Sequence, residues 1–174
     1  MTQGVHAKPV EEIAALCAGC HGQNGVPISP DIPVIWGQHA GYMFLQLRDF
    51  KSGARTSPMM QPMAAELSRE DMMALAVYFD AKTWPNLGQP SASAPDAARA
   101  KGDIASGQCT QCHLGGFLGD STNPRLAGQS VVYLQATMQA FHDGTRANNP
   151  WMNALLKTYA ADDLTALAHY LGGL

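Results

Sequence analysis

The chain has 174 residues, a hydrophobic content of 46% and a formal net charge of −3 at pH 7, which is typical of a globular protein rather than a disordered one. Its 11 Lys and Arg residues form no run, and this argues against a nucleic-acid-binding face. No apolar stretch approaches the roughly 20 residues that span a membrane, and no basic-then-apolar stretch opens the chain as a signal peptide would.

The four cysteines form two pairs, each followed directly by a histidine: Cys17, Cys20 and His21, then Cys109, Cys112 and His113. A disulfide scaffold, a tetrathiolate zinc site or a redox dithiol could also use these cysteines, but none of them requires the histidine. Cys-x-x-Cys-His is the attachment signature of c-type heme. Two thiols three positions apart at a helix end can bond one porphyrin edge, and the next residue then lies beneath the iron. We therefore predict two covalently bound hemes c, with His21 and His113 as proximal ligands.

An internal repeat covers most of the chain, and such a repeat decides the architecture. The two cysteine motifs lie 92 residues apart. Other segments recur at an offset of 91 or 92: residues 33–38 as 124–129, 50–55 as 141–146, 58–60 as 150–152, and 74–78 as 166–170. The repeat predicts an N-terminal domain at 1–82 and a C-terminal domain at 96–174, joined by a linker at 83–95 that is rich in Pro, Gly and Ser.

Every visible periodicity in the two units is helical, so we predict an all-α fold. A first helix, near residues 10–16 and again near 96–106, delivers each cysteine motif. A second, at 39–52 and 129–143, ends at a glycine, as many helices do. A third repeats apolar residues at i, i+3, i+4 and i+7, and Ser68 with Asp71 resembles a capping box at its start in the first unit. A unit of about 80 residues has a small core of its own, which a large apolar cofactor would complete.

The second axial ligand decides whether each iron is closed or open to a substrate. Met60 and Met152 are equivalent in the repeat, and each lies eight residues before the start of its C-terminal helix. Met152 competes only with Met138, which lies in the middle of a predicted helix. Met59 and Met63 remain alternatives to Met60. We predict ligation of the irons by His21 with Met60 and by His113 with Met152.

We predict structural roles for the remaining histidines and for three aromatic residues. We expect four further histidines to be surface or packing residues: His6, His39, His142 and His169. Three aromatic residues are expected to pack around the porphyrins rather than to conduct electrons: Trp36, Tyr42 and Tyr133. A buried indole or phenol of this kind usually satisfies its polar atom with a hydrogen bond.

These features together resemble the diheme cytochrome c4 family, over nearly the whole chain. The likeness lies in Cys-Ala-Gly-Cys-His-Gly at 17–22, Gly-Gln at 37–38 ahead of Tyr42, Gln-Leu-Arg-Asp-Phe-Lys-Ser-Gly-Ala-Arg at 46–55, and Met60 followed by Leu-Ser at 67–68 and a helix ending in Tyr-Phe at 78–79. The second unit departs from the family with Tyr-Ala at 159–160, where the family usually has Leu-Ser, and with an unusual Gly-Gly-Phe-Leu-Gly loop at 115–119. The residues around Trp36 and Trp151 also differ from the commoner small or aliphatic choices.

The resemblance implies two tandem class I cytochrome c domains related by pseudo-twofold symmetry, with the hemes facing each other across the domain contact. It implies iron ligands at His21, Met60, His113 and Met152. Family members are periplasmic electron carriers, commonly to terminal oxidases, and close relatives are electron-accepting subunits of periplasmic dehydrogenases.

We therefore expect a periplasmic electron-transfer protein that carries one electron at a time by outer-sphere transfer and is not an enzyme. Its partners would be redox proteins: a donor dehydrogenase or cytochrome complex, and an acceptor oxidase or reductase. A dedicated subunit of one dehydrogenase is the alternative, and a diheme peroxidase-type enzyme is a weaker one because it needs an open iron. Periplasmic localisation follows from the chemistry, since covalent heme attachment takes place outside the bacterial cytoplasm.

Overall fold

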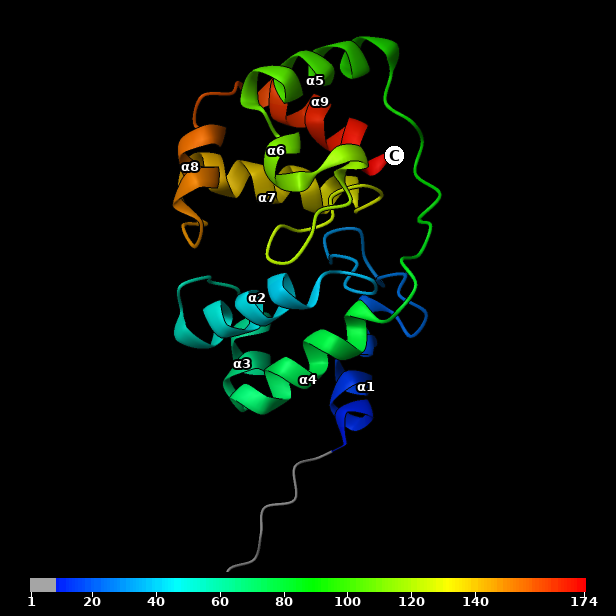
Figure 1. Ribbon diagram of the computed structural model, residues 1–174, viewed down its shortest axis with the longest axis vertical. Helices are drawn as coiled ribbons and strands as arrows, with labels where there is room; N and C mark the ends of the chain where they lie inside the picture. Colours follow the sequence, from blue (N-terminus) through cyan, green and yellow to red (C-terminus); the bar gives the residue numbers. More distant parts are fainter. Residues whose placement is uncertain (1–8) are drawn as a thin grey trace, which may run out of the picture.

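The computed structural model describes residues 9–174. Within this range the regular structure is helical, apart from one isolated bridge between Asp120 and Asn123. Figure 1 shows a group of helices from each half of the sequence, stacked along the long axis and connected by an extended segment along one side. The predicted all-α class is confirmed.

The N-terminal unit contains α1 (Val10–His21), α2 (Ala40–Ser52), α3 (Met60–Ala65) and α4 (Arg69–Asp80). Helix α4 buries the predicted apolar face: Met72, Leu75, Ala76 and Phe79. The capping box at its start is confirmed. The Asp71 backbone N–H donates to Ser68 Oγ at 3.0 Å, and the Ser68 N–H donates to the Asp71 carboxylate at 2.9 Å. This start fixes the position of α4 against α1 and α2, with which it packs.

The C-terminal unit contains α5 (Ala94–Gly107), α6 (Thr110–His113), the 3₁₀ turn η1 (Gly115–Phe117), α7 (Val131–Asp143), α8 (Pro150–Leu156) and α9 (Ala161–Gly172). It repeats the first unit but differs around the cysteine motif. Gln108 adopts a left-handed conformation with φ of 53°, so helix α5 ends before the second cysteine motif and α6 begins within it. The first motif, in contrast, lies inside the continuous helix α1.

Each unit has its own hydrophobic cluster. The buried residues of one cluster run from Ala14 to Phe79, and those of the other from Ala100 to Leu171. Residues 83–93 between them form no helix or strand, and α5 begins at Ala94, within the predicted linker. The domain boundaries at 82/83 and 95/96 stay a prediction.

Two buried glutamines join the units in a reciprocal way. Gln38 Nε2 donates to the Arg125 carbonyl at 3.1 Å, and its Oε1 accepts from the Arg125 N–H at 2.9 Å. Gln129 makes the same pair of bonds to Val34, at 3.0 and 2.8 Å. Gln38 and Gln129 are equivalent in the repeat, as are Val34 and Arg125. Such an exchange is what an isologous, twofold-related contact produces.

The linker contributes the side chain of Trp84 to this contact. The Arg125 guanidinium lies over its indole ring, 4.6 Å from the ring centroid. On two sides the packing is close enough to exclude a side chain. A Cβ at Gly37 would lie 3.0 Å from the Trp84 backbone nitrogen, and one at Gly128 would lie 3.1 Å from Nε1. Both glycines also have positive φ, of 70° and 72°, which glycine adopts without strain.

The residues that precede α2 and α7 also cross the contact. His39 Nε2 lies 2.8 Å from the Leu118 carbonyl oxygen, and the Ser130 hydroxyl donates to the Pro30 carbonyl. His39 and Ser130 are equivalent in the repeat. We expected His39 to be a surface or packing residue with no shared role, but it makes the same kind of contact as Ser130. The chemical difference between imidazole and hydroxyl conceals this equivalence in the sequence.

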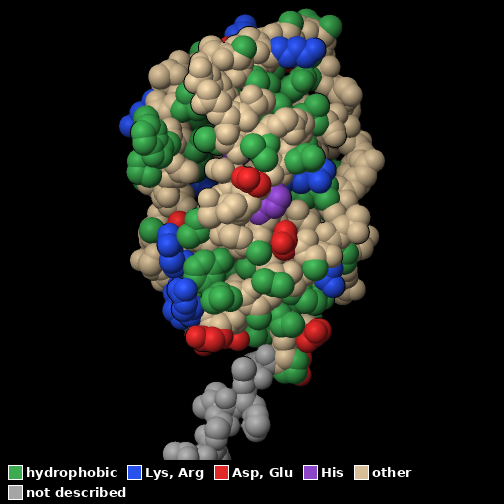
Figure 2. All heavy atoms as spheres, viewed as in Figure 1, with side chains coloured by type: hydrophobic (Ala, Val, Ile, Leu, Met, Phe, Trp, Pro, Cys, Tyr) green, Lys and Arg blue, Asp and Glu red, His purple; other side chains and the backbone are tan. Residues whose placement is uncertain are grey.

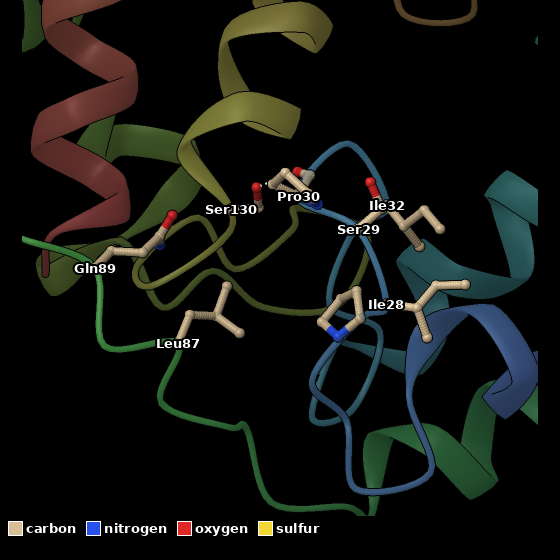
Figure 3. A pocket seen from close by; sticks show the side chains of 8 residues that line it. Ile28, Ser29, Pro30, Ile32, Leu87, Gln89 and Ser130 are labelled. Atoms are coloured by element: carbon tan, nitrogen blue, oxygen red, sulfur yellow. Dashed lines mark hydrogen bonds between the residues drawn. The ribbon is translucent and has the colours of Figure 1, made fainter.

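A hollow lies beside the Ser130 contact, between the loop that follows the first cysteine motif and the linker (Figure 3). Its lining residues are Pro27, Ile28, Ser29, Pro30, Ile32, Leu87, Gln89 and Ser130. None of these side chains titrates near neutral pH. The Gln89 amide is engaged with the backbone of Gln129, Val131 and Gly172. We therefore regard this hollow as a packing gap and not as a reactive site.

Replacing Gln129 with Ala tests the contact between the units. The change leaves the buried N–H and C=O of Val34 without partners, which costs about 2–3 kcal/mol of unfolding free energy. Chemical denaturation of the holoprotein measures this loss. Gln135→Ala, at an exposed position, is the matched control and should change stability by less than about 0.5 kcal/mol. Equal stabilities for the two variants would contradict the role given to Gln129.

Candidate heme sites

The first cysteine motif occupies the last turns of helix α1. Cys17 and Cys20 are separated by three positions, so their side chains lie on the same side of the helix, and His21 is its last residue. None of the four cysteines takes part in a disulfide. Burial raises the pKa of the Cys17 and Cys109 thiols. Each motif therefore offers a pair of thiols next to a histidine, and the first thiol of each pair is held in its neutral form by burial.

Both motif histidines are buried and held by one ring nitrogen. His21 is 7% exposed and His113 is 8% exposed. Nδ1 of His21 lies 2.8 Å from the Pro33 carbonyl oxygen, and Nδ1 of His113 lies 3.0 Å from that of Pro124. A carbonyl only accepts, so Nδ1 carries the proton and Nε2 keeps its lone pair. Burial also lowers the pKa of both imidazoles. A neutral imidazole oriented by a backbone carbonyl is the usual arrangement of a histidine metal ligand.

The predicted methionine ligands each lie in the first turn of a short helix. Met60 begins α3, and its N–H donates to Ser57 Oγ at 3.2 Å. Met152 lies in α8, and its N–H donates to Asn149 Oδ1 at 3.2 Å. Both side chains are half-buried, and Met152 packs against the C-terminal cluster. The two helices were not predicted, although Asn149 followed by proline is a common helix start.

The two alternatives to Met60 are more exposed. Met59 is 73% exposed and Met63 is 44% exposed. Burial and the repeat both favour Met60. The assignment of all four iron ligands nevertheless stays a prediction.

The zinc alternative finds no support in the structure. Within residues 9–174, no group of three or more His, Cys, Asp or Glu side chains comes together in a way that could hold a metal ion. The two cysteine pairs thus belong to separate sites, and a tetrathiolate centre would need them in one place.

Two guanidinium groups meet at the contact between the units. Arg55 Nη1 and Arg146 Nη2 each donate to the same oxygen, Gln46 Oε1, at 2.9 Å. Each arginine also bonds to a tyrosine of the other unit. Arg55 Nη2 donates to the Tyr133 hydroxyl at 3.0 Å, and Arg146 Nη2 donates to the Tyr42 hydroxyl at 3.3 Å. We call these five residues the arginine seam.

The arginine seam carries excess positive charge. Burial raises the pKa of Tyr133, but the charges of Arg55 and Arg146 lower it by more, to about 7. Among the described residues, the hydrogen bonds of both guanidinium groups go to amide and phenol oxygens and not to a carboxylate. The buried carboxylate of Asp49 bonds instead to Arg48 and Asn148.

Buried charges are normally paired, because leaving an ion without a partner in the interior is costly. A heme carries two propionate groups, and these are anions of the kind that guanidinium binds well. The seam residues therefore fit the group that the two cysteine motifs would attach. Tyr42 and Tyr133 were expected only to pack around the porphyrins. Their bonds to arginines of the opposite unit were missed, although both tyrosines and both arginines recur at the same offset of 91.

Trp36 and the histidines outside the cysteine motifs were predicted to have structural roles, and the structure shows what surrounds those that it describes. Trp36 packs in the N-terminal cluster, with the Lys82 ammonium 5.8 Å from its ring centroid. Its buried indole nitrogen has no hydrogen-bond partner among the described residues, contrary to the usual behaviour of a buried indole. His142 Nδ1 lies 2.7 Å from the Asp143 carboxylate, and His169 Nδ1 lies 3.5 Å from that of Asp96. Both have partly exposed side chains, as expected. His6 lies outside the described residues.

The fold and the paired sites define a class of protein, an electron-transfer protein built from two cytochrome c units. The comparisons with known proteins agree. The sequence is 36% identical to the thiosulfate dehydrogenase electron acceptor of Stutzerimonas stutzeri, over 92% of this chain and 80% of that protein. It is 32% identical to cytochrome c4 of Pseudomonas aeruginosa, over 92% and 85%. No protein-family model matches the chain.

The structure resembles cytochrome c4 of Acidithiobacillus ferrooxidans, with a TM-score of 0.83, 32% identity and coverage of 92% of this chain and 99% of that one. The chain belongs to the diheme cytochrome c4 family. It is an electron carrier with covalently bound heme c, and not an enzyme. Within residues 9–174, no helix combines the length and the apolar character that crossing a membrane requires.

Thiol titration checks the covalent attachment. If both motifs bond heme, the denatured holoprotein will show no reactive thiol, because all four sulfur atoms are in thioether bonds. The same chain, produced without heme attachment and fully reduced, will show four. Two reactive thiols in the denatured holoprotein would mean that only one motif carries heme, and four would contradict the assignment of both.

Proposed function

We propose that the chain carries two hemes c, the first held by Cys17, Cys20, His21 and Met60, and the second by Cys109, Cys112, His113 and Met152. The observation that carries this proposal is the repetition of one arrangement. In each unit a buried histidine with its Nδ1 on a proline carbonyl follows a pair of thiols, and a half-buried methionine lies in the first turn of a short helix about 40 residues later.

A bound heme c exchanges one electron between its ferric and ferrous states. The residues of the chain would orient the ligands of its iron and keep other molecules away from it. Nδ1 of each histidine donates to its carbonyl and so directs Nε2 towards a metal. Met60 and Met152 would supply the second ligand of each iron and so leave no position open for a substrate. Histidine–methionine ligation also raises the reduction potential.

The arginine seam would hold propionate groups from both hemes. Two guanidinium groups next to these carboxylates neutralise part of their charge in a buried place. Positive charge near an iron favours the ferrous state, which is the less positive one, so the seam acts in the same direction as the methionines. The role of the polypeptide would be to hold the two groups in place, and no residue of the chain would make or break a bond during transfer.

We infer that a periplasmic dehydrogenase donates the electrons. The support is the similarity to the Stutzerimonas stutzeri protein, whose name describes it as the electron acceptor of thiosulfate dehydrogenase. The match covers 92% of this chain, so both units and the contact between them take part in the likeness. The same chemistry of heme attachment supports a periplasmic location.

Replacing the methionines tests the ligand assignment. Met60→Ala and Met152→Ala should each remove about half of the methionine-to-iron charge-transfer absorbance of the oxidised protein, because each opens one iron. Met59→Ala and Met63→Ala are the matched controls and should keep the full band. Loss of the band in Met63→Ala with its retention in Met60→Ala would move the ligand to Met63. An unchanged band in Met152→Ala would refute the second ligand.

A further inference from the structure

The most exposed large aromatic side chain of the described chain is next to a predicted iron ligand. Trp151 is 86% exposed and directly precedes Met152. Its repeat equivalent, Met59, occupies the same position before Met60. A tryptophan buries up to about 250 Å² when it is covered, so leaving it in water gives up a large apolar contribution. An isolated carrier gains nothing in stability from this position.

Helix α8 has an inner face that packs against the C-terminal cluster and an outer face that is exposed. Met152, Leu155 and Leu156 follow the i, i+3, i+4 spacing and pack into the C-terminal cluster. One position earlier, Trp151 is rotated by about 100° from Met152 around the helix. It shares the outer face with other exposed residues, namely Ala154, Lys157 and Thr158. The inner face therefore serves the core and the predicted iron site, while the outer face is left to the solvent.

The surroundings of Trp151 are cationic, although the chain as a whole has a net charge of −3. Residues 150–158, which form α8 and the turn after it, contain one charged side chain, that of the exposed Lys157. Arg48 of the other unit lies nearby, since Asp49 joins it to Asn148 with hydrogen bonds of 2.8 Å on each side. Figure 2 shows apolar side chains protruding over α8 at the left edge, with Lys and Arg side chains beside them and over the end of α2. We call Trp151, Lys157 and Arg48 the α8 surface.

The nearest acidic residue before this segment is Asp143, at the end of α7. Its carboxylate accepts hydrogen bonds from Gln139 Nε2 at 2.8 Å and lies 2.7 Å from His142 Nδ1. The equivalent stretch of the N-terminal unit, residues 58–66, contains one charged side chain of the opposite sign, that of Glu66. Of the two positions that precede a predicted methionine ligand, only the one at Trp151 thus combines an exposed aromatic ring with an excess of positive charge.

We propose that the α8 surface is the docking site for the electron-donating dehydrogenase, with Trp151 inserted into an apolar patch that acidic residues surround on that partner. Tryptophan is enriched among the few residues that dominate binding energy at interfaces, and a charged rim speeds association. Because Trp151 is covalently next to Met152, a partner that covers it comes close to the C-terminal heme. This inference rests on the proposed function, since it takes its donor from it.

The test measures electron transfer from the thiosulfate dehydrogenase of Stutzerimonas stutzeri, reduced with thiosulfate and mixed anaerobically with the oxidised holoprotein. Trp151→Ala should lower the second-order rate constant at least about tenfold. Met73→Ala, which truncates another exposed apolar side chain, on α4, is the control and should change the rate less than twofold. The methionine-to-iron band and the midpoint potentials of Trp151→Ala must match the wild type, so that the slower rate reflects docking alone.

The role of the positive charge at Lys157 is tested with the same measurement of the electron-transfer rate. Lys157→Glu should slow the reaction at low ionic strength, and the difference from the wild type should vanish at high ionic strength, where rim charges are screened. Lys101→Glu on α5 makes the same charge change elsewhere and should have a smaller effect. Equal effects of the two variants would show that only net charge matters and would overturn the cationic rim.

The outcomes separate the two proposals. A wild type that is reduced, with Trp151→Ala as fast as the wild type, overturns the docking site and leaves the proposed donor in place. A wild type that the dehydrogenase does not reduce overturns both. A wild type that sediments as a dimer, with a monomeric Trp151→Ala variant of unchanged rate, would assign the surface to a second copy of this chain and overturn the proposal.

Discussion

Two positive charges placed next to each other at the contact between the units are the constraint on which the structure depends. Arg55 and Arg146 come from different units and converge on a single amide oxygen, that of Gln46, at 2.9 Å each. This arrangement is unfavourable for an isolated polypeptide, since like charges repel and burial removes their solvation. It becomes favourable when anions are present between the units. The contact therefore makes physical sense as part of a cofactor site.

The remainder of the contact is organised around that seam by the repeat. Gln38 and Gln129 exchange backbone bonds, and Tyr42 and Tyr133 accept from the arginine of the opposite unit. The hydrogen bonds that the two glutamines make to the backbone are symmetric between the units, but the polar and charged side chains around the arginines are not. The repeat equivalents of Gln46 and Asp49 are Thr137 and Ala140, so the amide that bridges the arginines and the buried carboxylate come from one unit only.

The fold class and the candidate site residues could be predicted because their signals are local. The cysteine motifs are read over five residues, and the apolar spacing and capping box of α4 over about one helix length. The repeat then transferred each assignment to the other unit. The capping box has no full counterpart at α9, where Asp163 accepts from the Ala160 N–H and alanine has no hydroxyl to return the bond.

The features that escaped prediction depend on residues far apart in the chain. The partner of Tyr133 is Arg55, 78 positions away, and the partner of Tyr42 is Arg146, 104 positions away. Nothing in either neighbourhood indicates the pairing, and only the common offset could have suggested it. The break at Gln108 escaped for another reason, because a left-handed glutamine has no clear sequence signal. The position of Trp84 likewise follows from two glycines of different units.

A redox titration of the visible spectrum, with a heme count per chain, tests the central claim most directly. The account predicts two covalent hemes per polypeptide, both six-coordinate in each oxidation state, with two one-electron steps at moderately high potential. It also predicts that the reduced protein does not bind carbon monoxide rapidly. A single heme per chain, or rapid carbon monoxide binding at either iron, would contradict it.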